Sequence, residues 1–163
     1  MHTAEIDVSV IIPAYNAEGL IDKAIQSVQK QLGMSWEIII VENGSADNTY
    51  EKCREYSETD DRISVFQSEK GVSRARNKGI LNAKGRWICF LDADDYLYDN
   101  AFKYLKGLLE NQDTDFVVFG HNSSSENEIS KNAAEQICDQ EKYSALRCEF
   151  LQNPTQYMPV WGK

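Results

Sequence analysis

Three carboxylates follow an apolar run near the middle of the chain. Asp92, Asp94 and Asp95 come directly after Trp87–Leu91, in the sequence FLDADD. Carboxylates that lie close together repel one another, and their pKa values rise unless a positive charge joins them. A divalent cation removes that cost, and oxygen ligands of this kind suit Mg²⁺ or Mn²⁺. The pattern therefore predicts a metal site that substrate phosphates complete. A turn or helix cap built from the same aspartates is the alternative.

Polar residues also follow two other apolar runs. The segment Pro13–Asn16 closes the run at 8–14, and Glu42 and Asn43 follow the run at 36–41. In open α/β sheets, ligands bind beyond the carboxyl ends of the strands. If these runs are parallel strands, we expect both groups and the aspartates to face one acidic crevice that also holds an aromatic ring and amide groups.

The main basic cluster of the chain is GVSRARNKG at 71–79, which contains Arg74, Arg76 and Lys78. A helix N-terminus with arginines nearby can bind an anion, while a solvated basic helix face is the alternative. The sequence lacks G-x-x-x-x-G-K-[ST], so it has no Walker loop. It also lacks G-x-G-x-x-G after the first strand, which argues against a Rossmann dinucleotide site.

The elements that must position these residues alternate regularly along the chain. Apolar, β-rich runs predict strands over 8–14, 36–41, 62–67, 85–92 and 115–120, and amphipathic patterns predict helices over 17–32, 48–58, 71–83 and 100–111. The alternation predicts an α/β fold with a doubly wound, mostly parallel sheet and helices on both faces. Asn16 is the expected N-cap of the first helix. We also expect a surface loop at 122–132 and a helix at 139–151.

Composition limits the class of protein. The 163 residues suit one domain, and the net charge of −9 argues against nucleic acid or an anionic bilayer as the main partner. The four cysteines form no C-x-x-C pair, which favours structural thiols. The N-terminus has no signal-peptide pattern, and no apolar run approaches the roughly 20 residues that span a bilayer. These features predict a cytoplasmic protein.

Four segments, in chain order, resemble the motifs of a known family. VSVIIPAYNAEGLIDKAIQSV, EIIIVENGSADNT, GVSRARNKGI and FLDADDYL closely resemble successive motifs of the family 2 inverting glycosyltransferases. The resemblance covers about residues 7–121, and VWGK in the tail weakly resembles a W-x-K element. It implies the Rossmann-like GT-A fold of nucleotide-diphospho-sugar transferases in a single domain at 1–163. It also implies a donor half at about 7–121 and an incomplete acceptor part at about 122–163, so we expect a truncated C-terminal part.

The resemblance also implies roles for individual residues. Tyr15 would lie near the base, and Glu42 and Asn43 occupy positions where the family usually carries aspartates that read it. Asp94 and Asp92 would bind the metal, Mg²⁺ or Mn²⁺. The general base of this family usually lies beyond the W-x-K element, so the catalytic residue is not identified. The implied nucleotide-sugar-binding residues are Pro13, Ala14, Tyr15, Asn16, Glu42, Asn43, Arg76, Asn77, Asp92, Ala93 and Asp94.

The implied activity is metal-dependent, inverting transfer of a sugar from a nucleotide-diphospho-sugar, expected to be a UDP-sugar, to an acceptor hydroxyl. The acceptor would be a sugar or lipid-linked sugar in cell-surface polysaccharide or glycolipid synthesis, with peripheral association at the inner face of the membrane. The alternative is a domain that binds a nucleotide sugar without turnover. A phosphotransferase of the haloacid dehalogenase type carries its aspartates after the first strand, and a receiver-like module needs an acidic pair there, where this chain has Ala-Tyr-Asn.

Overall fold

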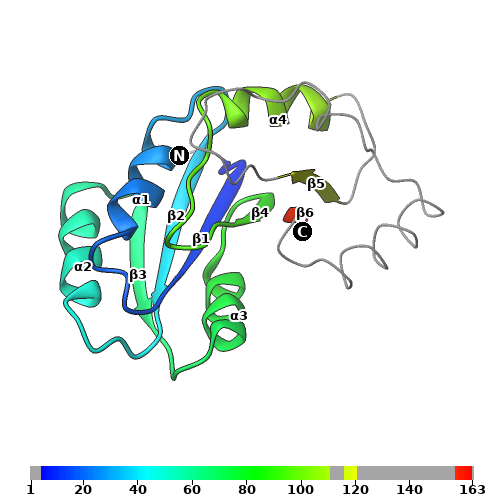
Figure 1. The fold of residues 1–163 in the computed structure, drawn as a ribbon. Helices are drawn as coiled ribbons and strands as arrows, with labels where there is room; N and C mark the ends of the chain where they lie inside the picture. Colours follow the sequence, from blue (N-terminus) through cyan, green and yellow to red (C-terminus); the bar gives the residue numbers. More distant parts are fainter. Residues whose placement is uncertain (1–4, 111–115, 121–156, 163) are drawn as a thin grey trace.

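The computed structural model describes residues 5–110, 116–120 and 157–162, which form one sheet with helices on both faces (Figure 1). The sheet has six strands in the order β3-β2-β1-β4-β6-β5. Their bounds are Val8–Ala14 (β1), Trp36–Glu42 (β2), Ile63–Gln67 (β3), Trp87–Phe90 (β4), Phe116–Gly120 (β5) and Tyr157–Gly162 (β6). The central strands β1 and β2 are buried along their whole length, which explains their unbroken apolar sequences.

The pairing confirms the predicted doubly wound, mostly parallel α/β fold. β1 pairs in parallel with β2 and with β4, and β2 pairs in parallel with β3. The exception is β6, which lies antiparallel between β4 and β5. Sequence analysis assigned no element to this part of the tail. Pro159 interrupts any strand pattern there, and the strand is recognisable only from its neighbours in space.

Helices cover the two faces of the sheet unequally. The helices are α1 (Ile21–Gln29), α2 (Thr49–Thr59), α3 (Val72–Asn82) and α4 (Ala101–Glu110). One apolar cluster joins β1 and β2 to Ile25 of α1, Cys53 of α2 and Phe102 of α4. A smaller cluster on the opposite face joins Ala75 of α3 to Ile11 and other apolar side chains of the sheet. Thus α3, the helix that carries the basic cluster, packs on the face of the sheet opposite to α1, α2 and α4 (Figure 1).

Contact between α3 and the sheet is close enough to require a glycine. A Cβ atom added at Gly79 would lie 2.4 Å from Cγ2 of Ile11, whose side chain is fully buried in β1. Real Cβ atoms do not approach another carbon so closely, so the absence of a side chain at Gly79 sets the distance between α3 and β1. That distance also sets the position of Arg76, one turn earlier on α3.

Two local predictions need correction. Asn16 does not cap the first helix, because α1 begins at Ile21 after a turn and Leu20 is its N-terminal flanking residue. Asn16 instead adopts a φ of 49°, in the left-handed region that asparagine tolerates, and bonds the 45–46 segment. β4 is also shorter than the predicted strand over 85–92, because the chain turns at Asp92. The expected loop at 122–132 and helix at 139–151 lie outside the described residues.

Cys53 and Cys89 are free, buried thiols, as expected for structural cysteines. Burial raises the pKa of each thiol to about 12, so neither is a thiolate near neutral pH. Cys138 and Cys148 lie outside the described residues. In the described part of the chain, no helix combines the length and the hydropathy that crossing a membrane requires.

Candidate functional site

The acidic segment forms a tight turn directly after β4. The Asp95 N–H donates a hydrogen bond to the Asp92 carbonyl over 3.0 Å, which closes the turn. Ala93 is buried, whereas the side chains of Asp92 and Asp94 are exposed. The turn therefore buries its small residue and presents two carboxylates to one side. The turn that was the alternative to a metal site is therefore present, but a backbone carbonyl closes it and the side-chain carboxylates of Asp92 and Asp94 take no part in it.

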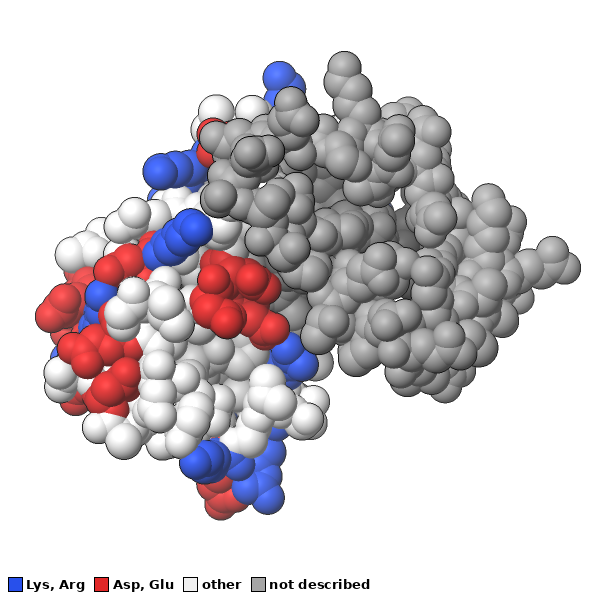
Figure 2. Space-filling model, in the orientation of Figure 1, with Lys and Arg blue, Asp and Glu red and all other residues white. Residues whose placement is uncertain are grey.

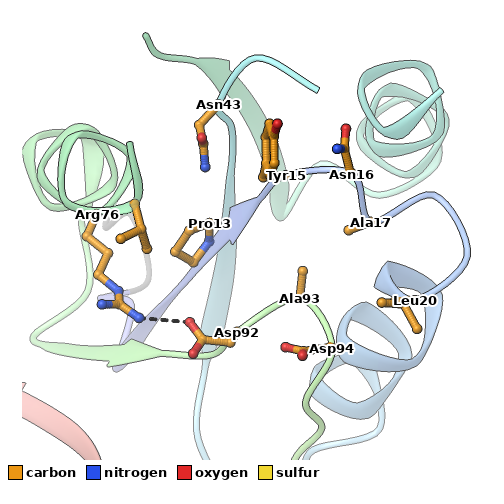
Figure 3. A pocket seen from close by; sticks show the side chains of 11 residues that line it. Pro13, Tyr15, Asn16, Ala17, Leu20, Asn43, Arg76, Asp92, Ala93 and Asp94 are labelled. Atoms are coloured by element: carbon orange, nitrogen blue, oxygen red, sulfur yellow. Dashed lines mark hydrogen bonds and ion pairs between the residues drawn. The ribbon is translucent and has the colours of Figure 1, made fainter. Parts of the chain in front are cut away.

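These two carboxylates line a pocket of about 340 Å³ beyond the carboxyl ends of β1, β2 and β4 (Figure 3). Its volume lies at the lower end of the range usual for small-molecule sites, roughly 300–1,000 Å³. The pocket brings together the sequence-predicted residues Pro13, Tyr15, Asn16, Asn43, Arg76, Asp92, Ala93 and Asp94. Three others, Ala14, Glu42 and Asn77, do not line it.

Three pocket residues were not among the candidates: Ala17, Leu20 and Val72. Leu20 and Val72 are 53% and 48% exposed, although both belong to apolar helical patterns that suggest burial. Each stands at the start of a helix, Leu20 before α1 and Val72 as the first residue of α3. Their position at helix starts that face the strand ends is the signal that could have identified them.

Arg76 supplies the positive charge of the pocket. Its Nη2 donates to Oδ1 of Asp92 over 2.8 Å, and Figure 3 shows the guanidinium reaching from α3 across to the acidic turn. Its Nε is buried and has no hydrogen-bond partner among the described residues. A buried donor without a partner is costly, so this arrangement favours an anionic ligand next to Arg76.

The opposite wall of the pocket is held by bonds between two loops. Asn16 Oδ1 accepts from the Ala46 N–H, and the Asn16 N–H donates to Ser45 Oγ. The Ala17 N–H donates to Thr49 Oγ1, which ties the same loop to the first turn of α2. Tyr15 stands 41% exposed on this loop, and its hydroxyl accepts from Lys70 Nζ over 2.6 Å. The loop thus presents an aromatic ring on a fixed backbone.

Glu42 lies behind the pocket and organises the turn after β2. Its carboxylate accepts from the Ser45 N–H and from Gln67 Nε2. Burial by itself would raise the pKa of Glu42, but hydrogen bonds from Ser45, Gln67 and Gly44 outweigh it and hold the pKa below its usual value. The carboxylate is therefore ionised and fully engaged near neutral pH, and it shapes the loop rather than facing the cavity.

Two side chains, one on α1 and one just after it, hold the segment that follows the acidic turn. Ser27 Oγ accepts from the Leu97 N–H over 3.0 Å. The buried amide of Gln31 donates to the Tyr98 carbonyl over 2.9 Å and accepts from the Phe102 N–H over 3.1 Å. These bonds fix the path of the chain between Asp92 and α4. Sequence analysis did not single out either residue, because an isolated polar residue on a helix usually faces solvent.

Replacing Gln31 with leucine should lower the free energy of unfolding by about 2–3 kcal/mol, because the buried Phe102 N–H loses its acceptor and the Tyr98 carbonyl keeps only the bond from the Ala101 N–H. Urea unfolding followed by circular dichroism measures the change. Gln26→Leu is the matched control, since Gln26 is exposed and bonds only a surface tyrosine hydroxyl. Equal stabilities of the two variants would show that the Gln31 bonds do not hold this segment.

The donor set of the pocket suits a hard divalent cation. Asp92 and Asp94 offer carboxylate oxygens, and Mg²⁺ usually takes one or two carboxylates and completes its shell with waters and substrate phosphates. No group of three or more His, Cys, Asp or Glu side chains placed to hold a metal occurs within the described ranges. The two aspartates therefore fit a cation shared with a bound phosphate ligand.

Comparison with known proteins agrees with the fold and the motifs. The sequence profile of Glycosyl transferase family 2 matches residues 9–161. The UDP-Glc:alpha-D-GlcNAc-diphosphoundecaprenol beta-1,3-glucosyltransferase WfgD of Escherichia coli is 36% identical over 124 residues, which cover 75% of this chain and 48% of that protein. The chain spans less than half the length of the curated relatives it matches.

Solved structures share the fold. S. aureus TarS 1–349 in complex with UDP superposes with a TM-score of 0.68 at 24% identity, covering 77% of this chain and 38% of that one. The mannosyltransferase PcManGT of Pyrobaculum calidifontis, in complex with GDP-Man and Mn²⁺, gives a TM-score of 0.56 at 23% identity and covers 70% and 35%. At these identities the likeness establishes the architecture alone.

Proposed function

The chain belongs to glycosyl transferase family 2, and from that membership we propose that it moves a sugar from a nucleotide-diphospho-sugar to an acceptor hydroxyl. The observation that supports the proposal is that one side of the pocket is acidic and the other side carries an aromatic ring and an amide. Asp92 and Asp94 lie on one side, and Tyr15 and Asn43 lie on the other (Figure 3). A nucleotide diphosphate has the same two parts, a doubly charged group that needs counter-charge and a flat base that needs apolar contact and a few hydrogen bonds.

The acidic side must be neutralised before it can hold a diphosphate. Asp and Glu side chains gather near the centre of the face shown in Figure 2. The lining of the pocket carries Asp92 and Asp94 against one cation, Arg76, so an approaching anion meets net negative charge there. We propose that Asp94 and Asp92 hold Mg²⁺ or Mn²⁺, which when bound neutralises charge on the leaving diphosphate. Arg76 adds a fixed positive charge beside Asp92 and is positioned to bind a phosphate oxygen.

The positions of the other residues support the remaining roles that we propose. Pro13, Asn16 and Ala93 form the floor and walls that orient the donor, and Ala14 and Glu42 support them from behind. Asn77 is exposed on α3 next to Arg76, and we propose that it contacts the donor from outside the pocket described here. Residues 7–121 would form the donor-binding half of a single domain. The proposed reaction inverts the anomeric centre, with a carboxylate base that we do not assign.

The choice of donor and acceptor rests on relatives. The name of the E. coli relative gives UDP-glucose as its donor and a lipid-linked sugar as its acceptor, and one structural neighbour holds UDP. On this basis we propose a UDP-sugar donor and a sugar or lipid-linked sugar acceptor for this chain. The proposed sugar transfer would then be a step in cell-surface polysaccharide or glycolipid synthesis, and the protein would bind its acceptor at the inner face of the membrane.

Isothermal titration of the chain with UDP, with and without Mn²⁺, tests the proposal. We expect binding that strengthens at least about tenfold with Mn²⁺, because the cation links the carboxylates to the diphosphate. A sugar-transfer assay on the same sample then separates an active transferase from a domain that binds without turnover. Absence of any nucleoside diphosphate binding in the presence of Mn²⁺ or Mg²⁺ would overturn the proposal.

A further inference from the structure

The two carboxylates that line the pocket differ in their partners. Asp92 Oδ1 accepts a hydrogen bond from Nη2 of Arg76 over 2.8 Å, and Figure 3 marks this bond with a dashed line. Asp94 lines the same pocket, and its side chain makes no hydrogen bond or ion pair within the residues that the structure describes. One carboxylate is therefore free to bind a ligand, and a cation of the protein already occupies the other.

The ion pair between Arg76 and Asp92 is positioned by the end of β4 and is weak enough to open. The guanidinium carbon lies 5.7 Å from the centre of the ring of Phe90, the last residue of β4, which is within the range of a cation–π contact. The side chains of Arg76 and Asp92 are 38% and 52% exposed, and ion pairs with this much contact with water contribute little. Arg76 can therefore exchange Asp92 for another anion at low cost.

Arg76 opposes a divalent cation that reaches the pocket before a nucleotide does. The cation would have to share Asp92 with the guanidinium, and the two positive charges would then lie close together. Like charges at short range repel each other, and water lowers this repulsion without removing it. The pocket without nucleotide should therefore bind Mn²⁺ less tightly than the same two carboxylates would without Arg76.

A diphosphate reverses this effect of Arg76. The Nε of Arg76 is buried and has no acceptor within the described residues, and a phosphate oxygen is a good acceptor for a guanidinium. When Arg76 bonds to a phosphate oxygen, Asp92 loses its competing partner and becomes available to the cation. The negative diphosphate then also separates the two positive charges and offers the cation further oxygen ligands.

Resting on the proposed binding of a nucleoside diphosphate, we propose that Arg76 couples the two ligands of the pocket. Paired with Asp92, it opposes the cation, and bonded to the diphosphate, it leaves Asp92 to the cation. Coupling of this kind is reciprocal, so UDP strengthens the binding of Mn²⁺ by the same factor by which Mn²⁺ strengthens the binding of UDP. The protein would take up cation and nucleotide together and hold little cation when nucleotide is absent.

Arg76→Met tests this inference because it removes the charge and keeps most of the length of the side chain. The dissociation constant of Mn²⁺ without nucleotide is measured from the electron paramagnetic resonance signal of free Mn²⁺, and that of UDP in excess Mn²⁺ by calorimetry. We expect the variant to bind Mn²⁺ about tenfold more tightly and UDP about tenfold more weakly than the wild type does. The opposite signs are decisive, because a distorted pocket would bind both ligands more weakly.

Arg74→Met is the matched control. Arg74 lies on the same helix, pairs with Glu69 and does not line the pocket, so both dissociation constants should stay within about twofold of the wild type. Arg76→Met that binds Mn²⁺ alone no more tightly than the wild type, including no detectable binding to either protein, overturns the inference. Binding of UDP by the wild type upholds the proposed function in that case. A wild type that binds no UDP in the presence of Mn²⁺ overturns both.

Discussion

Replacing Asp94 with asparagine should weaken Mn²⁺-dependent binding of UDP by about 100-fold or more. Asp94 lines the pocket beside Asp92, and its exposed carboxylate makes no side-chain hydrogen bond within the part of the chain that the structure describes. An amide keeps the shape but removes the charge that attracts a divalent cation, and metal sites lose affinity steeply when a ligand is weakened. Calorimetric titration of the variant with UDP and Mn²⁺ measures the loss.

The fold should survive this change, which distinguishes a ligand-binding role from a structural one. We expect the free energy of unfolding to change by less than about 0.5 kcal/mol, as for most exposed substitutions. Asp99→Asn is the matched control, because Asp99 is an exposed aspartate of the same segment that does not line the pocket. If Asp94→Asn binds UDP and Mn²⁺ as tightly as Asp99→Asn does, the acidic turn is not a metal site.

Replacing Gly79 with alanine should destabilise the protein by about 2–3 kcal/mol, although alanine favours a helix over glycine by about 1 kcal/mol. The added Cβ would lie 2.4 Å from Cγ2 of Ile11, a buried side chain near the centre of the sheet. Either Ile11 leaves its rotamer or α3 moves away from β1. Because Arg76 is on α3, we also expect weaker UDP binding. Urea unfolding gives the stability change.

Gly107→Ala provides the control for the same substitution in a helix. Among the residues that the structure describes, none lies within 4 Å of a Cβ added at Gly107 in α4, so this change should stabilise the protein by up to about 1 kcal/mol. A double variant that combines Gly79→Ala with Ile11→Ala tests the proposed cause, since shortening Ile11 should remove most of the additional cost of the methyl group at position 79. Stabilities that change equally at Gly79 and Gly107 would show that α3 does not depend on close approach to β1.

Much of this fold was predictable because its central strands are buried on both faces. A strand covered by helices on each side must be apolar at successive positions, and Val8–Ala14 and Trp36–Glu42 show this directly. Once these strands are taken as parallel, the residues at their carboxyl ends must share one edge of the sheet. That argument brought Tyr15, Asn43 and Asp92 together from sequence positions far apart, and all three line the pocket.

The parts that escaped prediction depend on contacts between distant segments. In the sequence, Gln31 has the pattern of a surface residue on a helix. Its structural role comes from hydrogen bonds to the backbone of Tyr98 and Phe102, about 70 residues away. The strand β6 has no pattern of its own and exists through pairing with β4 and β5. The orientation of the Asn43 amide depends on the Gly71 N–H, which no local rule connects to it.

The most direct test of the central claim is an anomalous difference map from crystals grown with Mn²⁺ and UDP. We predict a manganese peak coordinated by Asp94, with Asp92 beside it, that also contacts the diphosphate, and a base lying against Tyr15 and Asn43. A UDP molecule bound in this pocket with no anomalous peak near either aspartate would contradict the metal site, and a manganese peak elsewhere with an empty pocket would contradict the account as a whole.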